Sequence, residues 1–267
     1  MNLLPNAPIG IFDSGIGGLT IASAIHRMMP KESLIYYGDT AHMPYGDKSP
    51  ELIESYSLHI SNYLYEKGCK LIVIACNTAS AHAFKSVQKN MKGKVAVINV
   101  IDPTVSAVSQ QFAKGKVGVI GTRGTINSGI YSRKIKKNNK YLTVTSLATP
   151  LLAPMIEEGF FNNNISRTII HSYLSKKSLA EIDALILACT HYPLIKNEVK
   201  SFYKKNTKIF DSAEMVALAV KQYLNQAQLE AAEDNFADLQ FYVSDYTESF
   251  EKSTKFFFGK EIKLKKT

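Results

Sequence analysis

Eight short runs of apolar and β-branched residues recur along this 267-residue chain, and longer segments of helical periodicity lie between them. The apolar positions within each run are continuous rather than alternating, as in strands that are covered on both faces. Such strands form parallel sheets, so the sequence predicts an α/β fold. The expected strands are residues 9–12, 33–38, 71–75, 95–100, 116–121, 142–147, 184–188 and 208–211. The expected helical segments include residues 50–66, 78–90, 165–177 and 212–226.

Two parts of the chain repeat one local pattern. In each part an apolar run surrounds a glycine and leads into a turn of glycine and hydroxyl residues: residues 9–18 read IGIFDSGIGG and residues 117–125 read VGVIGTRGT. A cysteine then follows at a similar distance. Cys76 lies 66 residues, and Cys189 lies 71 residues, after the first glycine of its own segment. The repetition predicts two similar lobes, each a mainly parallel sheet flanked by helices.

The position of the active site follows from this arrangement. Ligands of open α/β sheets bind beyond the carboxyl ends of the strands, which is where both cysteines are expected. Two such lobes facing each other would enclose a cleft with one cysteine on each wall. The first lobe is expected to comprise residues 1–99 and 210–267 with Asp13 and Cys76, and the second lobe residues 100–209 with Cys189 and His191.

The two cysteines share a sequence context that allows two interpretations. Residues 72–80 read IVIACNTAS and residues 185–193 read LILACTHYP, so each cysteine ends an apolar run and precedes polar residues. A free cysteine is most often a small buried hydrophobe. Polar groups and a helix start beside a cysteine instead favour its thiolate, which acts as a base or nucleophile. Cys69 precedes its strand and lacks this context, so we expect it to be structural.

The glycine-rich turn after the first strand suggests a dinucleotide site, but only weakly. Its pattern is G-x-G-G rather than G-x-G-x-x-G, and Asp13 at its entrance would repel a pyrophosphate. Asp39 lies at the distance expected for a ribose contact, so a nicotinamide-dependent oxidoreductase stays open as an alternative. His191 lies two residues after Cys189, and a Cys-x-His pair is too sparse for a structural zinc site.

The composition excludes several other classes. The net charge is +9, but the lysines lie in scattered groups such as residues 132–140, with no nucleic-acid-binding signature. No apolar stretch of 18 residues is present, and residues 1–15 do not read as a secretory signal. Three cysteines argue for a reducing compartment over a disulfide framework. We therefore expect a cytoplasmic protein that binds neither membrane nor nucleic acid.

Five motifs taken together resemble the glutamate racemases of the aspartate/glutamate racemase family. They occur in the order and spacing of that family, and the resemblance covers nearly the whole chain. The motifs are FDSGIGGLT, YYGDTAHMPYGDKS, IACNTAS, GVIGTRGTI and ACTHYPL.

The resemblance implies interconversion of L- and D-glutamate by two bases, without a cofactor or a metal, supplying D-glutamate for peptidoglycan synthesis. One cysteine thiolate would remove the Cα proton while the other cysteine, as a thiol, protonates the opposite face. It further implies a small-molecule substrate, glutamate, and we expect a homodimer. A related aspartate racemase stays possible. The two substrates differ by one methylene group, and discrimination between them depends on the depth of the pocket. A two-lobed binding protein without catalysis is the third alternative.

The resemblance also assigns residues. Its catalytic set is Cys76, Cys189, Asp13, His191 and Glu157, where Asp13 would assist near Cys76, and His191 with Glu157 would assist near Cys189. Its substrate-binding set is Asp13, Ser14, Pro44, Tyr45, Gly46, Cys76, Asn77, Thr78, Thr122, Cys189, Thr190 and His191.

Overall fold

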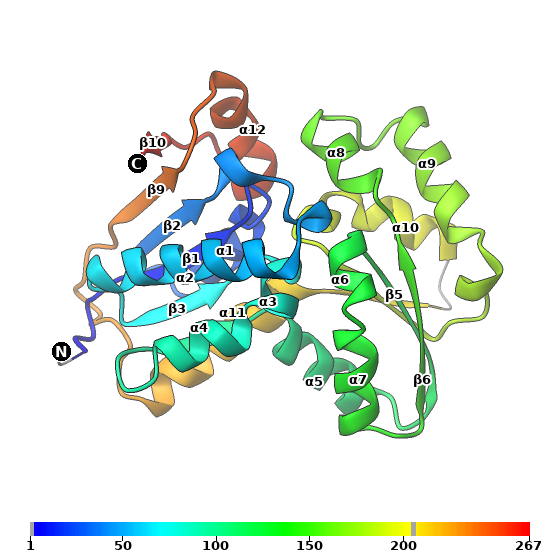
Figure 1. The fold of residues 1–267 in the computed structure, drawn as a ribbon, viewed down its shortest axis with the longest axis horizontal. Coiled ribbons are helices and arrows are strands. Elements are labelled where there is room, and N and C mark those ends of the chain that lie inside the picture. The colour runs from blue at the N-terminus through cyan, green and yellow to red at the C-terminus, as the bar shows by residue number, and fades with distance from the viewer. Residues whose placement is uncertain (1–2, 204–206) are drawn as a thin grey trace.

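Parallel strands form two separate sheets in the computed structural model, which describes residues 3–203 and 207–267. The first sheet has the strand order β10-β9-β2-β1-β3-β4, and the second has the order β6-β5-β7-β8 (Figure 1). The first comprises β1 (Ile9–Asp13), β2 (Leu34–Gly38), β3 (Leu71–Ile74), β4 (Ala96–Asn99), β9 (Leu239–Val243) and β10 (Lys265–Lys266). The second comprises β5 (Gly115–Gly121), β6 (Leu142–Ala148), β7 (Ala184–Ala188) and β8 (Lys208–Asp211).

Helices flank both sheets, which confirms the predicted α/β fold with two lobes (Figure 1). The helices of the first half are α1 (Leu19–Met28), α2 (Pro50–Glu66), α3 (Asn77–His82), α4 (Phe84–Asn90), α5 (Ile101–Gln111) and α6 (Arg123–Asn127). Those of the second half are α7 (Ile130–Asn138), α8 (Leu152–Glu157), α9 (Asn164–Leu174), α10 (Lys196–Tyr203), α11 (Ser212–Gln226) and α12 (Glu248–Phe258). Four short 3-10 turns complete the path: η1 (Thr40–His42), η2 (Tyr45–Asp47), η3 (Lys177–Leu179) and η4 (Tyr192–Ile195).

Local sequence signals set the ends of the helices as expected. Ser49 caps α2, whose first residue is Pro50, because proline tolerates the first helical position and serine accepts a free N–H group. Asp211 caps α11 through the backbone N–H of Ala213. The predicted segment 78–90 is divided into α3 and α4, with Ala83 between them.

The central strands are buried over their whole length. Every residue of β1, β3 and β7 is buried, in keeping with the continuous apolar runs that predicted them. In the first lobe α1 packs against α11 and α12, while α5 packs against both α7 and α11 and so lies between the two sheets. The carboxyl ends of the central strands of each sheet thereby come to one region between the lobes (Figure 1).

The expected strands lie within one or two residues of those observed, but β9 and β10 are additional. The division into lobes at residues 99/100 and 209/210 stays a prediction, and residues 1–2 and 204–206 of those lobes lie outside the described part of the chain. β8 belongs to the second sheet and continues to Asp211. No helix within the described residues is long and apolar enough to cross a membrane.

Candidate active site

A pocket of about 290 Å³ lies where the carboxyl ends of the two sheets meet. Residues from both lobes line it, and both motif cysteines are among them. The first lobe contributes Ser14, Met43, Pro44, Tyr45, Gly46, Cys76, Asn77 and Thr78. The second contributes Thr122, Ala153, Pro154, Glu157, Ala188, Cys189, Thr190 and His191. The structure thus brings together every expected site residue except Asp13 at the surface of one pocket.

The first wall is built around Cys76, which caps α3 directly after β3. The backbone N–H of Ala79 points at its sulfur over 3.4 Å, and the sulfur lies 3.7 Å from the hydroxyl of Ser14. Burial raises the pKa of the Cys76 thiol to about 12, and the nearby charge of Asp13 acts in the same direction. Cys76 is therefore held as a neutral thiol near neutral pH.

Asp13 lies behind this wall, at the end of β1, and is fully buried. Its Oδ2 accepts hydrogen bonds from the backbone N–H groups of Gly15 (3.2 Å) and Gly18 (3.1 Å), while Thr190 donates to Oδ1 over 3.5 Å. Burial raises the pKa of Asp13, and the positive charge of His191 opposes that rise. Asp13 therefore contacts the pocket through its neighbours rather than lining it.

The second wall is built around Cys189, which follows β7. Its sulfur lies 3.6 Å from Nδ1 of His191, and Nε2 of the same ring lies 2.8 Å from Oε1 of Glu157. Burial alone would lower the pKa of His191, but the hydrogen bonds to Cys189 and Glu157 outweigh it and raise the pKa well above its usual value. Glu158, by contrast, is exposed at the end of α8. Between the two adjacent glutamates, the structure places Glu157 at the site.

The glycine-rich turn after β1 packs directly against this second wall. A methyl group on Gly17 would lie 2.4 Å from Cε1 of His191 and 2.7 Å from Oγ1 of Thr190. Thr20 donates a hydrogen bond of 3.0 Å to the backbone carbonyl of Thr190. The absence of a side chain at Gly17 therefore allows close contact between the lobes, as expected for a turn that does not hold a phosphate.

A second set of contacts joins the lobes on the opposite side of the pocket. The hydroxyls of Thr78 and Thr122 lie 2.9 Å apart, and a methyl group on Gly46 would lie 2.8 Å from Cβ of Thr122. Tyr131 of α7 donates a hydrogen bond of 2.7 Å to Oδ1 of Asn77 in α3. No motif distinguishes Tyr131 from an ordinary core tyrosine, so the sequence alone does not reveal its place beside the site.

Asp39, the basis of the nicotinamide alternative, already has partners within the protein. Its Oδ2 accepts a hydrogen bond of 2.5 Å from Tyr45, and its Oδ1 lies 2.8 Å from both the Ser244 hydroxyl and Nδ1 of His42. Both carboxylate oxygens are thus engaged, so this residue is not free to bind a ribose. It instead fixes the hydroxyl of Tyr45, whose side chain lines the pocket.

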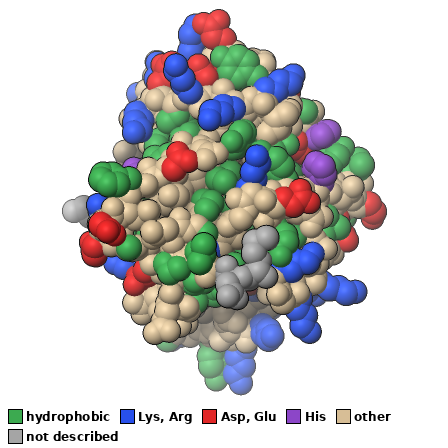
Figure 2. All heavy atoms as spheres, turned by 90° about the vertical axis from the view of Figure 1, so that its left-hand side faces the viewer, with side chains coloured by type: hydrophobic (Ala, Val, Ile, Leu, Met, Phe, Trp, Pro, Cys, Tyr) green, Lys and Arg blue, Asp and Glu red, His purple; other side chains and the backbone are tan. Residues whose placement is uncertain are grey.

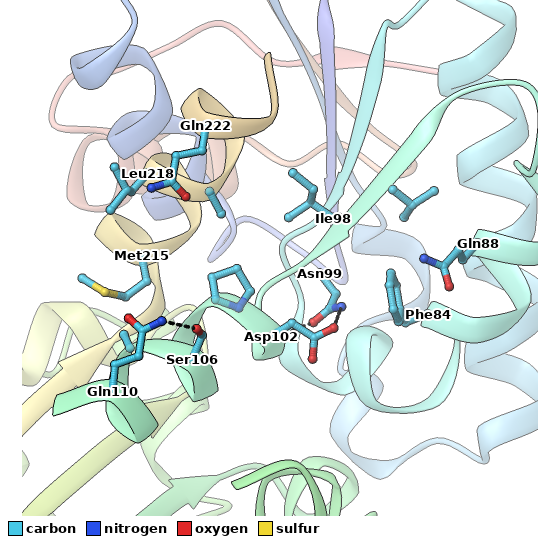
Figure 3. A pocket seen from close by; sticks show the side chains of 14 residues that line it. Phe84, Gln88, Ile98, Asn99, Asp102, Ser106, Gln110, Met215, Leu218 and Gln222 are labelled. Carbon is cyan, nitrogen blue, oxygen red and sulfur yellow. Dashed lines mark hydrogen bonds between the residues drawn. The ribbon is translucent and has the colours of Figure 1, made fainter. Parts of the chain in front are cut away.

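A larger groove of about 560 Å³ lies away from the cysteines, between α4, α5, α11 and the edge strand β4 (Figure 3). Amide and apolar side chains dominate its lining, including Gln88, Gln110 and Met215. Within the described part of the chain, Asp102 is the one titratable side chain that lines it, and Asn99 hydrogen-bonds to that carboxylate. Proton transfer needs a pair of titratable groups, which the smaller pocket supplies.

Charged side chains of both signs are spread over the face that Figure 2 draws. Figure 2 shows lysine and arginine side chains spread among acidic and polar ones over one face of the first lobe. Within residues 3–203 and 207–267, no group of three or more histidine, cysteine, aspartate or glutamate side chains is placed to hold a metal ion. The ionisable side chains that line the pocket are Tyr45, Cys76, Glu157, Cys189 and His191.

This fold and this site define a two-lobed α/β enzyme with one cysteine on each side of a shared pocket. The family model "Asp/Glu/Hydantoin racemase" matches residues 19–220. Among curated proteins, the glutamate racemase of Geobacter metallireducens is 39% identical over 97% of this chain and 95% of its own length. That of Persephonella marina is 40% identical, over 97% and 96%.

Solved structures agree with the sequence relatives. Glutamate racemase from Francisella tularensis, in complex with D-glutamate, superposes with a TM-score of 0.92 at 37% identity and covers 99% of this chain and 98% of that chain. Glutamate racemase from Aquifex pyrophilus gives a TM-score of 0.80 at 38% identity and covers 97% of each chain. The chain belongs to the Asp/Glu/Hydantoin racemase family, and its resemblance to glutamate racemases is confirmed.

Proposed function

We propose that this protein interconverts L- and D-glutamate by direct proton transfer at Cα. The observation that carries the proposal is the placement of two thiols, one from each lobe, at the surface of a single pocket. Inversion of a stereocentre by proton transfer needs a base on one side and an acid on the other. The names of the relatives, which are about 40% identical, support glutamate as the substrate.

The first wall suits the role of the acid, and the second wall suits the role of the base. The pKa of Cys76 is raised to about 12, so this thiol holds the proton to be delivered. Cys189 faces His191, whose raised pKa keeps the imidazole positively charged, and a cation beside a cysteine stabilises its thiolate. We therefore assign the base to Cys189 and the acid to Cys76 when L-glutamate is the substrate.

The forward reaction, from L- to D-glutamate, removes one proton from Cα and adds another. The Cys189 thiolate takes the Cα proton of L-glutamate, and the electron pair of the broken C–H bond stays on Cα. The Cys76 thiol gives its proton to the opposite face of Cα, and that electron pair forms the new C–H bond of D-glutamate. The reverse reaction begins with a Cys76 thiolate and a Cys189 thiol, so the two residues exchange roles for D-glutamate.

The Cα proton of an amino acid is very weakly acidic, so the pocket must stabilise the developing negative charge. Its polar lining offers hydroxyl and amide donors from Ser14, Asn77, Thr78, Thr122 and Thr190. Preorganised donors in a site that excludes water stabilise such a charge far more than donors in solution. We propose that these side chains hold the substrate carboxylates in place, and that the hydroxyl donors among them also lower the barrier.

The biological setting is part of the same proposal. D-glutamate produced here would be used for peptidoglycan synthesis, in the cytoplasm, by an enzyme that we expect to be a homodimer. Aspartate is the alternative substrate, although the aspartate racemases among the solved structures share only 20–21% identity and thus agree in fold alone.

Proton NMR of L-glutamate in heavy water, with chiral analysis and no added cofactor, tests the proposal. Loss of the Cα proton signal together with appearance of D-glutamate is the expected result. An unchanged spectrum with folded, reduced protein would refute glutamate racemisation, and the same assay with aspartate would test the alternative. Micromolar binding of NAD or NADP would instead favour an oxidoreductase.

A further inference from the structure

Tyr131 and Asn77 form a buried hydrogen bond across the two lobes. Each side chain is only 3% exposed, and the hydroxyl of Tyr131 donates to Oδ1 of Asn77 over 2.7 Å. Asn77 is the residue after Cys76 and lines the pocket, whereas Tyr131 belongs to α7 of the other lobe and is absent from the pocket lining. A residue that does not line the site is therefore bonded directly to one that does.

We propose that Tyr131 is a positioning residue, which directs the side-chain N–H groups of Asn77 toward the bound substrate from the opposite lobe. This inference rests on the proposed racemase function. It assigns to the second lobe a part in binding the substrate on the first wall, next to Cys76.

The orientation of the Asn77 amide follows from the hydrogen-bonding capacity of the two groups. A tyrosine hydroxyl has one proton to donate, and an amide has one oxygen to accept it and one nitrogen that only donates. With the amide reversed, Nδ2 would point at the Tyr131 oxygen, and the buried hydroxyl proton would lose the acceptor that the structure gives it. Burial raises the pKa of Tyr131, so the hydroxyl keeps that proton. The oxygen of the amide is thus fixed toward Tyr131.

The nitrogen of the same amide indicates where a ligand atom would bind. Nδ2 of Asn77 is buried and has no hydrogen-bond partner among the residues that the structure describes. Buried polar groups are almost always paired, so an unpaired donor on a residue that lines a pocket indicates an acceptor supplied by the ligand. A carboxylate oxygen of glutamate is such an acceptor, and its charge would make the bond stronger than one between neutral groups.

The bond also depends on how closely the lobes approach. Asn77 belongs to α3 and Tyr131 to α7, so separation of the lobes would remove the hydroxyl and release the amide to rotate. Thr78 and Thr122 already join the lobes beside it. Tyr131 is therefore not needed to hold the lobes together, and its particular effect falls on the direction of the amide.

Tyr131→Phe tests this, because it removes the hydroxyl and retains the ring. We expect KM for both glutamate enantiomers to rise about tenfold with kcat changed less than threefold, since a contact to the carboxylate acts equally on the bound substrate and the transition state. Tyr203→Phe is the matched control, because its hydroxyl donates within the second lobe, to the carbonyl of Leu179, far from the pocket lining. It should leave KM unchanged.

A double-mutant cycle separates positioning from a general loss of stability. In an Asn77→Ala background, Tyr131→Phe should cause no further rise in KM, because the amide that it orients is gone. Asn77→Asp, which has no side-chain N–H group, gives a second background should the alanine variant fail to fold. An unchanged KM in Tyr131→Phe, or equal effects of Tyr131→Phe in all backgrounds, would overturn the inference.

The outcome is distinguishable from failure of the proposed function. An active parent enzyme with an unaffected Tyr131→Phe variant removes only the positioning role. A folded parent that neither racemises glutamate nor gains thermal stability from D-glutamate removes the racemase proposal and the positioning role together. Melting curves of each variant with and without 10 mM D-glutamate supply this readout.

Discussion

The two walls of the pocket are built from the same local sequence but have opposite electrostatic surroundings. On each wall a buried parallel strand ends one or two residues before a cysteine, which is followed by a polar residue. Cys76 then lies in front of a buried carboxylate, Asp13, which disfavours its thiolate. Cys189 instead lies beside His191, which Glu157 holds in place. A repeated backbone thus presents two thiols in different electrostatic surroundings.

The difference arises two residues after each cysteine. On the first wall this residue is Thr78 within α3, and the helix start directs the N–H of Ala79 at the sulfur of Cys76, which lowers the pKa of the thiol, but burial and the charge of Asp13 outweigh it. On the second wall it is His191, and the chain turns into η4 instead of a regular helix, which leaves the imidazole against the sulfur. In the proposed mechanism, acid and base roles are therefore set by the neighbours of the thiols, since the thiols themselves are chemically identical.

Removal of either thiol is expected to have the largest effect on activity, and it tests whether both walls take part in the reaction. We expect Cys76→Ala and Cys189→Ala each to lower kcat for racemisation by about 10³-fold or more, because proton transfer by a positioned group contributes about 10²–10⁴-fold. Chiral chromatography of both reaction directions measures this. Cys69→Ala is the control, since Cys69 is buried just before β3, at the end of the strand opposite Cys76, and does not line the pocket. Racemisation near the parental rate by either pocket variant would contradict the two-base assignment.

Replacement of His191 should make the two walls more alike. His191→Asn removes the positive charge beside Cys189, and we expect kcat to fall about 10²-fold. Iodoacetamide at pH 7.5, followed by peptide mass spectrometry, should modify Cys189 before Cys76 in the parent protein, and glutamate should protect both. The variant should lose the preference for Cys189. If Cys76 reacts first in the parent, the assignment of acid and base to the two walls is reversed.

Close contact between the walls can be tested at the glycine turn. Gly17→Ala would place a methyl group 2.4 Å from the ring of His191, so we expect the ring to shift and kcat/KM to fall about 10²-fold. Gly15→Ala is the matched variant in the same turn, where the added methyl would meet only Met43, at 3.5 Å. A loss below fivefold is expected there. Equal losses in the two variants would mean that the turn, and not the contact between walls, limits activity.

The sequence predicted the central strands well because continuous apolar runs are a direct record of burial on both faces. It did not predict β9, where Leu239, Gln240 and Tyr242 are only partly buried and the period is weak. Contacts from distant parts of the chain place this strand. The buried Lys70, for example, pairs with Glu32, whose other oxygen accepts the backbone N–H of Ala231 shortly before β9.

The site was predicted in a similarly uneven way. The cysteines and their polar neighbours lie in contiguous motifs, so a resemblance identified them. Tyr131 and the network around Asp39 act through side chains of residues far apart in the sequence, and no local pattern reveals them. The resemblance assigned Glu157, and the structure places its carboxylate beside His191 while the adjacent Glu158 is exposed. A single sequence does not show which distant side chains packing brings into contact.

The smallest effect concerns stability at alkaline pH. The pKa of Cys76 in the folded protein, about 12, lies above the usual 9.0, so the native state keeps a proton that the unfolded state releases. The stabilisation that comes from this difference in pKa is fully present below about pH 9. It is lost as the pH rises from 9 toward 12, by about 1.4 kcal/mol of unfolding free energy per pH unit. Between pH 8.5 and 10.5 the parent should therefore lose about 2 kcal/mol more of its free energy of unfolding than Cys76→Ala does.

Urea unfolding at the two pH values measures that difference, and Cys69 gives it an internal check. Burial raises the pKa of Cys69 to about 12 as well, without any contribution from the pocket. Cys69→Ala should therefore reduce the alkaline loss to a similar extent while leaving racemisation intact. If Cys69→Ala reduces the loss and Cys76→Ala does not, the first wall is more hydrated than the structure indicates, and Cys76 is then not held as the acid by burial.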